Sequence, residues 1–118
     1  MKLWLDDLRP IPNDYDIWCR TAAQAIWALE NYIITHISFD NDLGTGFGEG
    51  YQVANYIEEK AHSGDLVPMT WNVHSANPVR RESIRKAMEN ADKFWELSRG
   101  RYERDERSNA QRLWFAKK

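Results

Sequence analysis

The chain alternates short apolar runs with stretches in which apolar residues recur at helical spacing. Four runs of apolar and aromatic residues predict strands, at residues 2–5, 16–20, 36–39 and 69–73. Apolar residues three or four positions apart predict helices, at residues 21–31, 51–62 and from 78 onward. The predicted order is therefore mostly strand followed by helix.

The residue types at the predicted helix boundaries agree with these helices. Thr21 has a hydroxyl that can cap the first helix, and Gly64 is suited to end the second. Pro78 is favoured in the first turn of a helix, so the third helix is expected to begin there. The segment 44–50 holds four of the six glycines, which predicts a flexible loop before the second helix.

Strands that alternate with helices form a parallel sheet, and right-handed crossovers place helices on both of its faces. We therefore expect residues 1–97 to form a doubly wound α/β domain of about four strands. Such sheets bind ligands at the carboxyl ends of their strands. Residues 98–118 are expected to form a helical or loose basic appendage, with one apolar anchor at 113–115.

Length and composition fit one compact domain. Of the 118 residues, 42% are hydrophobic and 29% are charged. Fifteen aromatic residues, six of them Trp, can supply a core, to which we assign Trp4, Trp18, Trp27 and Trp71. Cys19 is the single cysteine, which excludes an intramolecular disulfide and a multi-cysteine zinc site.

Charge is distributed unevenly along the chain. Residues 1–97 carry nine Lys or Arg against fifteen Asp or Glu, whereas residues 98–118 carry seven against three. The acidic body argues against bulk binding of duplex DNA, while the basic end either meets phosphate or stays solvated. No apolar run is long enough to span a bilayer, and Asp6 and Asp7 stand where a signal peptide needs apolar residues. We expect a cytoplasmic protein without membrane contact.

Acidic residues follow two of the predicted strands. Asp6 and Asp7 come after the first strand, and Asp40 and Asp42 come after the third. In a parallel sheet these four carboxylates can converge on one edge, where a cation would relieve their repulsion. Oxygen ligands of this kind suit Mg²⁺ or Mn²⁺. The alternative is that each aspartate only caps a turn.

The segment after the last predicted strand carries an imidazole, a hydroxyl and an amide, at His74, Ser75 and Asn77. His74 is a candidate general acid or base, with a purely structural histidine as the alternative. Ser75 is a candidate for binding phosphate. Asn77 is either a phosphate ligand or the cap of the next helix, whose first backbone donors can hold an anion.

Two arginines are candidates for binding a phosphate near these residues. Arg9 follows the first acid pair and is fixed by Pro10, so it can reach a phosphate or pair with Asp6 or Asp7. Arg80 stands in the first turn of the third helix. A cation is unfavourable there, which indicates a local anion.

Four segments, taken in order, resemble the cyclic-phosphate processing receiver-like domains of bacteria and phages. They are Leu5–Pro10, Ile37–Gly44, Gly50–Tyr51 and Val73–Val79. The family is related to response-regulator receivers, which implies a flavodoxin-like fold and a cytosolic place in a bacterium or an infected host. By this resemblance Asp6, Asp7 and Asp40 match an acidic metal pocket. Asp40 takes the position of the phosphorylated aspartate, and Ser75 matches the hydroxyl after the fourth strand.

The sequence departs from this pattern at two points. Receivers that accept phosphate have a lysine after a fifth strand, and neither is evident here. Related sequences tend to have glycine after the Pro-Val pair, where this chain has Arg80. The first departure argues against ordinary phosphorelay signalling, and the second predicts either a tighter phosphate loop or a different ligand.

Three functions are compatible with these residues. The first is a metal-dependent phosphoesterase that opens a cyclic phosphate, on a 2′,3′-cyclic RNA end or a cyclic nucleotide signal. Here Asp7 and Asp40 act with the ion and His74 protonates the leaving oxygen, while other residues hold the phosphoryl oxygens, namely Arg9, Ser75, Asn77 and Arg80. The second is a protein that sequesters such a nucleotide without cleaving it. The third is a receiver-like switch.

Overall fold

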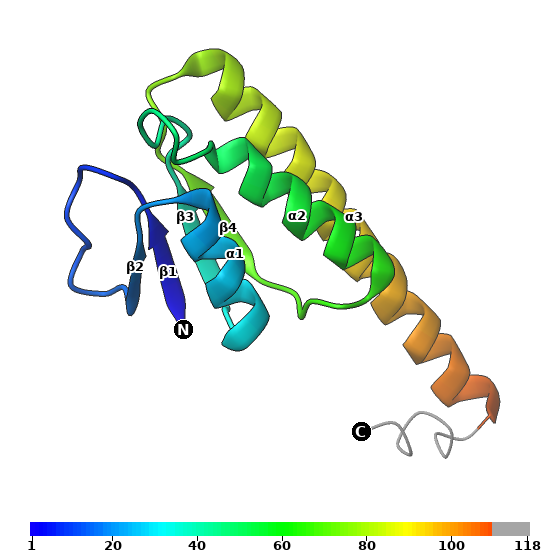
Figure 1. Cartoon of the computed structure of the whole chain (residues 1–118). Coiled ribbons are helices and arrows are strands. Elements are labelled where there is room, and N and C mark those ends of the chain that lie inside the picture. Colours follow the sequence, from blue (N-terminus) through cyan, green and yellow to red (C-terminus); the bar gives the residue numbers. More distant parts are fainter. Residues whose placement is uncertain (110–118) are drawn as a thin grey trace.

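The computed structural model describes the backbone of residues 1–109 and the side chains of residues 1–98. Four strands form one parallel sheet in the order β2-β1-β3-β4, with β1 at Lys2–Leu5, β2 at Ile17–Cys19, β3 at His36–Phe39 and β4 at Thr70–Val73. Three helices follow the strands (Figure 1): α1 at Ala22–Asn31, α2 at Gly50–Ser63 and α3 at Pro78–Asn109. The predicted fold class, a parallel α/β sheet of four strands, is confirmed.

The helix boundaries are set by the residues that the sequence singles out. The Thr21 hydroxyl accepts a hydrogen bond from the Gln24 N–H over 3.0 Å at the start of α1. Gly64 ends α2 with φ +81°, a left-handed conformation that favours glycine. Pro78 opens α3 as predicted, and the other predicted helix starts and ends differ from the observed ones by at most one residue.

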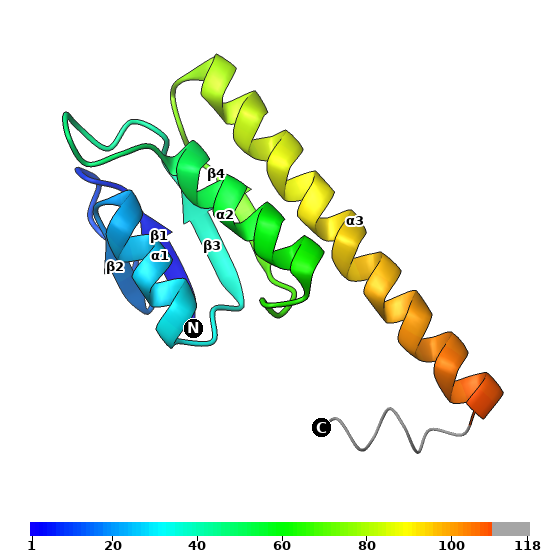
Figure 2. The ribbon, with the colours of Figure 1, turned by 45° about the vertical axis from the view of Figure 1, so that its right-hand side comes forward.

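The helices gather on one face of the sheet instead of covering both. The alternate positions Leu3, Leu5, Ile37 and Phe39 are fully buried and form the core with α1, α2 and α3. In both ribbon views α1 and α2 lie over the same face, and α3 runs beside α2 (Figures 1 and 2).

Among the described residues, a loop is what covers part of the other face, because the crossover from β1 to β2 contains no helix. This segment holds Pro10 and Pro12, which do not fit the interior of a helix. From it Tyr15 packs edge-on against Trp4 with ring centroids 5.2 Å apart. The sheet therefore has strands added on both sides of β1, but residues on its second face are partly exposed to solvent.

The tryptophans in and against the core are only in part the ones that the sequence predicted. Trp71 packs against the core and Trp95 belongs to it. Trp4 and Trp18 are half-buried beside the carboxyl edge of the sheet, outside the core cluster. Trp27 is 54% exposed on α1, so its assignment to the core was wrong. Helical periodicity places it on the solvent side of that helix.

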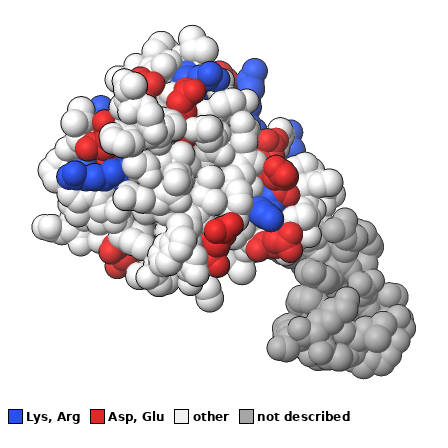
Figure 3. Space-filling model, in the orientation of Figure 1, with Lys and Arg blue, Asp and Glu red and all other residues white. Residues whose placement is uncertain are grey.

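The end of the chain is described as far as residue 109. Helix α3 passes residue 97 without interruption and continues to Asn109, so this part of the predicted appendage is helical. The proposed domain boundary at 97/98 stays a prediction, and the apolar anchor at 113–115 lies outside the described residues. No helix in the described part of the chain has the length and apolarity needed to span a membrane. On the face shown in Figure 3, acidic and basic side chains are interspersed.

Candidate functional site

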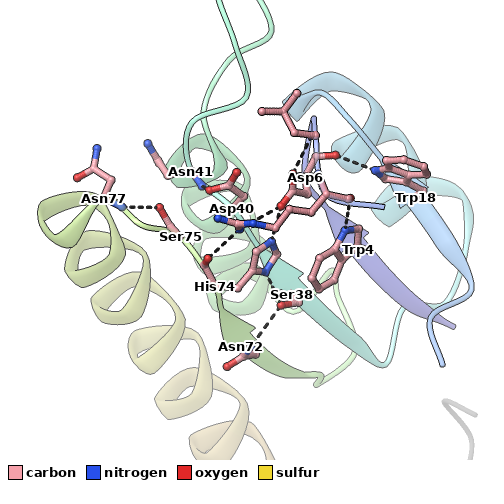
Figure 4. Close-up of polar contacts among 12 residues, drawn as sticks. Trp4, Asp6, Trp18, Ser38, Asp40, Asn41, Asn72, His74, Ser75 and Asn77 are labelled. Atoms are coloured by element: carbon pink, nitrogen blue, oxygen red, sulfur yellow. Dashed lines mark hydrogen bonds and ion pairs between the residues drawn. The ribbon is translucent and has the colours of Figure 1, made fainter. Parts of the chain in front are cut away.

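The carboxyl edge of the sheet brings together residues that are far apart in the sequence. The first residue after each of β1, β3 and β4 continues the hydrogen-bond ladder, with Asp6 N–H donating to Cys19 O, Asp40 N–H to Leu5 O and His74 N–H to Phe39 O. These three bonds, at 2.8–3.1 Å, hold Asp6, Asp40 and His74 in line along one edge. Figure 4 shows their side chains next to one another.

Three of the four predicted aspartates form one cluster. Carboxylate oxygens of Asp6, Asp7 and Asp40 all lie within 4.8 Å of one another. Asp42 is outside this group: it is exposed, and its carboxylate accepts a hydrogen bond from Asn41 Nδ2 over 3.0 Å. Of the four aspartates expected to converge, Asp42 is therefore not brought to the cluster, because it lies beyond the strand's edge in the following loop.

Asp6 is a buried carboxylate with four donors around it. Its Oδ1 accepts from the backbone N–H groups of Leu8 and Arg9, each at 2.8 Å, and its Oδ2 lies 3.2 Å from Arg9 Nη1 and 3.0 Å from His74 Nε2. Burial alone raises the pKa of Asp6, but these hydrogen bonds outweigh burial and lower the pKa below its ordinary value. Asp6 is therefore ionised near neutral pH.

Asp40 has the opposite electrostatic character. Burial, and next the negative charge of Asp6, raise the pKa of Asp40 above its ordinary value. The hydrogen bond from the Asn41 backbone N–H to Asp40 Oδ1, 2.8 Å long, only partly offsets this. The two neighbouring carboxylates thus differ. Hydrogen-bond donors stabilise the anionic form of Asp6, whereas Asp40 lies near that anion and has too few donors to offset the repulsion.

His74 is held in place by three neighbours. Its Nε2 faces Asp6, its Nδ1 lies 2.7 Å from Ser38 Oγ, and its ring stacks on Trp4 with centroids 4.1 Å apart and planes at 2°. Burial lowers the pKa of His74 more than the hydrogen bond with Asp6 raises it. Both ring nitrogens already have partners in the protein, so His74 supports Asp6 in this arrangement.

The loop before α2 lies close against the acid cluster. A Cβ at Gly50 would stand 2.1 Å from the Asp40 carbonyl oxygen, so only glycine allows this approach. At Gly44, with φ +90°, an added Cβ would stand 3.3 Å from the Phe47 ring and 3.4 Å from the Asp7 carboxylate. The buried Asn41 side chain accepts from the Tyr51 N–H and so ties the start of α2 to the end of β3.

The predicted phosphate ligands are not all brought to the cluster. Arg9 is there: its Nη1 donates to Asp6 Oδ2 and to the His74 carbonyl, and half of its side chain is exposed. Ser75 is buried, and its hydroxyl accepts from the Asn77 N–H. Asn77 caps α3, because its Oδ1 accepts from the Arg80 N–H over 3.1 Å.

Arg80 is engaged at the start of α2. Its Nε lies 3.2 Å from Glu49 Oε1, and its guanidinium sits over the Tyr51 ring at 4.9 Å. The anion that the sequence indicated for Arg80 is therefore a side chain of this protein. Glu49 and the Tyr51 ring belong to the capping region of α2, so Arg80 joins the starts of α2 and α3.

Sequence reasoning missed the residues beneath the site. Ser38 is fully buried and reads as an ordinary strand residue, and Asn72 donates to its hydroxyl over 3.3 Å. Asp6 is also supported from behind, because Trp18 Nε1 donates to its carbonyl oxygen over 2.7 Å. Strand alternation was the available signal: polar residues at 36, 38, 70 and 72 predict a face without a helix.

Comparison with known proteins decides the family. The family model for the cyclic-phosphate processing receiver domain matches residues 1–90. The chain belongs to this family. The matched part of the receiver domain includes all four strands and every residue of the acid cluster. Neither curated proteins nor solved structures gave a match.

The receiver domain has a receiver-like order of parallel strands in its described part, but β4 is followed directly by α3. The described residues contain no fifth strand, so the lysine position of phosphate-accepting receivers has no counterpart there. Arg9 is a cation whose charge lowers the pKa of Asp40.

Proposed function

We propose that this receiver domain is a metal-dependent phosphoesterase that opens a cyclic phosphate, on a 2′,3′-cyclic RNA end or a cyclic nucleotide signal. The observation that carries the proposal is the convergence of three carboxylates at the edge of the sheet, in a chain of the cyclic-phosphate processing family. Parallel α/β sheets bind their ligands at this edge.

The cluster fits a hard divalent cation in its donor chemistry. All three side chains offer carboxylate oxygen, the ligand type that suits Mg²⁺ and Mn²⁺. Burial, and next the negative charge of Asp6, raise the pKa of Asp40, and a bound cation would offset the repulsion between the two carboxylates. Asp6, Asp7 and Asp40 would hold the ion, which when bound supplies Lewis acidity toward phosphate and a more acidic water.

The neighbouring residues have distinct roles in this proposal. Arg9 binds a phosphoryl oxygen, since half of its side chain is exposed beside the cluster. His74 holds Asp6 in position instead of protonating the leaving oxygen, because its Nε2 already faces the Asp6 carboxylate. Ser75 and Asn77 shape the start of α3 next to the acids, through the bonds from Asn77 N–H and Arg80 N–H.

The test is turnover of cyclic phosphates with matched variants. Purified protein is incubated with Mg²⁺, Mn²⁺ or EDTA and with cyclic-ended RNA or a panel of cyclic nucleotides, and the products are separated by anion exchange. We expect cation-dependent opening that Asp40→Asn abolishes. Asp42→Asn is the matched control, since it removes an equal charge two residues away but outside the cluster, and it should keep activity. Equal loss in both variants would contradict the assignment.

A second function is favoured by the bonding of His74. With both ring nitrogens held by Asp6 and Ser38, no imidazole is free to act as a general acid, which suits a protein that sequesters a nucleotide intact. Heat denaturation after incubation distinguishes the two. A sequestering protein returns the nucleotide unchanged, whereas a phosphoesterase returns the opened product.

A further inference from the structure

A row of side chains crosses the sheet on the face that lacks helices. Strand register pairs Trp4 with Ser38 and Ser38 with Asn72, so the three residues lie side by side on β1, β3 and β4. His74 follows Asn72 by two positions and extends over the same face. Figure 4 shows Asn72, Ser38 and His74 in sequence toward Asp6.

The hydrogen bonds along this row have a direction. Ionised Asp6 can only accept, so the 3.0 Å contact makes His74 Nε2 the donor. A neutral imidazole with its proton on Nε2 has Nδ1 as an acceptor, and Ser38 Oγ lies 2.7 Å from that nitrogen. Asn72 Nδ2 in turn donates to Ser38 Oγ, which leaves the serine proton for His74.

We propose that Ser38 is a positioning residue of the site: by donating its hydroxyl proton to His74 Nδ1, it fixes the Nε2–H tautomer that holds Asp6 Oδ2. The Trp4 ring, parallel to the imidazole, fixes the plane in which both bonds are made. Ser38 is fully buried in the central part of the sheet, so water does not compete for this bond.

The same face contains a matched control. At the opposite end of the strands Thr70 Oγ1 lies 2.7 Å from His36 Nδ1, and His36 Nε2 lies 3.0 Å from the Tyr15 hydroxyl. This is again a hydroxyl paired with a histidine Nδ1, but it touches none of the three clustered aspartates. Thr70→Val removes the hydroxyl there as Ser38→Ala removes it beside His74.

The first test is the tautomer of His74, read from long-range ¹H–¹⁵N spectra of the full chain. In the unaltered protein we expect a protonated Nε2 and an unprotonated Nδ1. Ser38→Ala removes the donor at Nδ1 while Asp6 still favours Nε2–H, so we expect a share of the Nδ1–H form to appear beside the Nε2–H form. Asn72→Ala should give a smaller share. Thr70→Val should shift only the His36 signals. A protonated Nδ1 in the unaltered protein would overturn the proposal, even if Ser38→Ala fails to fold.

The second test is binding of Mn²⁺ alone, followed by electron paramagnetic resonance, and it rests on the proposed function. Ser38→Ala should weaken Mn²⁺ binding by about tenfold or more, as removal of partners behind metal ligands does elsewhere. Thr70→Val should leave the affinity unchanged. If the unaltered protein does not bind Mn²⁺, the proposed metal site fails, and the tautomer spectra alone still decide the role of Ser38.

Discussion

The two faces of the sheet differ in the residues that they carry and in the interactions that these residues make. The face under the helices is apolar and sealed, with residues such as Leu5 and Phe39 fully buried against three helices. The other face carries the Trp4, Ser38 and Asn72 row, and in the described part of the chain only a loop lies over part of it. The first face supplies stability through burial, whereas the second uses hydrogen bonds to orient the groups at the carboxyl edge.

A substitution on the apolar face should have the largest effect on the free energy of unfolding. Phe39→Ala removes a fully buried ring from the centre of the core, which should lower the free energy of unfolding by about 3–5 kcal/mol. Urea denaturation measures the change. A loss below about 1 kcal/mol would show that burial on this face is not the main source of stability.

On the polar face the largest effect should come from Asp6→Asn. The amide replaces an acceptor with a donor that faces Arg9 and His74, so the unfolding free energy should fall by about 2–3 kcal/mol. Asp7→Asn is the matched control in the same cluster. Because Asp7 is partly exposed, its loss should change stability by about 0.5 kcal/mol or less, and an equal effect in both variants would contradict the role given to the Asp6 donors.

Asp40→Asn should raise stability while it removes the proposed activity. Burial, and next the charge of Asp6, raise the pKa of Asp40, and the variant has neither the buried charge nor the repulsion, so Tm at neutral pH should increase by about 2–5 °C. The gain should shrink as the pH falls through the raised pKa, since Asp40 then becomes neutral in the original protein. Mg²⁺ should raise the Tm of the original protein more than that of the variant. A lower Tm in Asp40→Asn would contradict the repulsion.

The smallest effect concerns the pH dependence of stability. Burial lowers the pKa of both His36 and His74, so the unfolded chain binds protons first as the pH falls below the ordinary value of 6.5. Stability should therefore decline between pH 6.5 and the lowered folded pKa values. A series of Tm measurements checks this, and His36→Gln and His74→Gln should each flatten the slope. An unchanged slope in both variants would rule out these histidines as its cause.

Sequence patterns predicted the main elements because the relevant forces are local. Thr21, Gly64 and Pro78 act through the backbone conformation of a few neighbouring residues, so their effects are visible without a structure. The two-face coverage was not predicted correctly, because the β1 to β2 crossover holds no helix and the polar alternation of β3 and β4 was not used.

The sequence predicted which aspartates gather at the edge of the sheet, but it did not predict the hydrogen-bond and ion-pair partners of the site residues. Asp6, Asp7 and Asp40 were placed together because parallel strands end at one edge, and their carboxylate oxygens do meet there. Asp42 was included on the same argument, but the loop exposes it. Arg80 was included because a cation is unfavourable at the start of a helix, and in the structure it pairs with Glu49. Beyond the end of a strand, the direction of a side chain depends on the conformation of the loop, and the local sequence does not determine that conformation.

By itself the sequence determined the alternation of strands and helices, the family resemblance and the acidic edge, since each follows from residue type and spacing. The polar alternation in β3 and β4 also indicates the open face, but only the tertiary structure decided which partners His74 has. Strand register brings Trp4, Ser38 and Asn72 into one row across three strands. Residues up to 68 positions apart, such as Asp6 and His74, then share a hydrogen bond. Such pairings arise from packing of the whole chain and leave no pattern in any one segment.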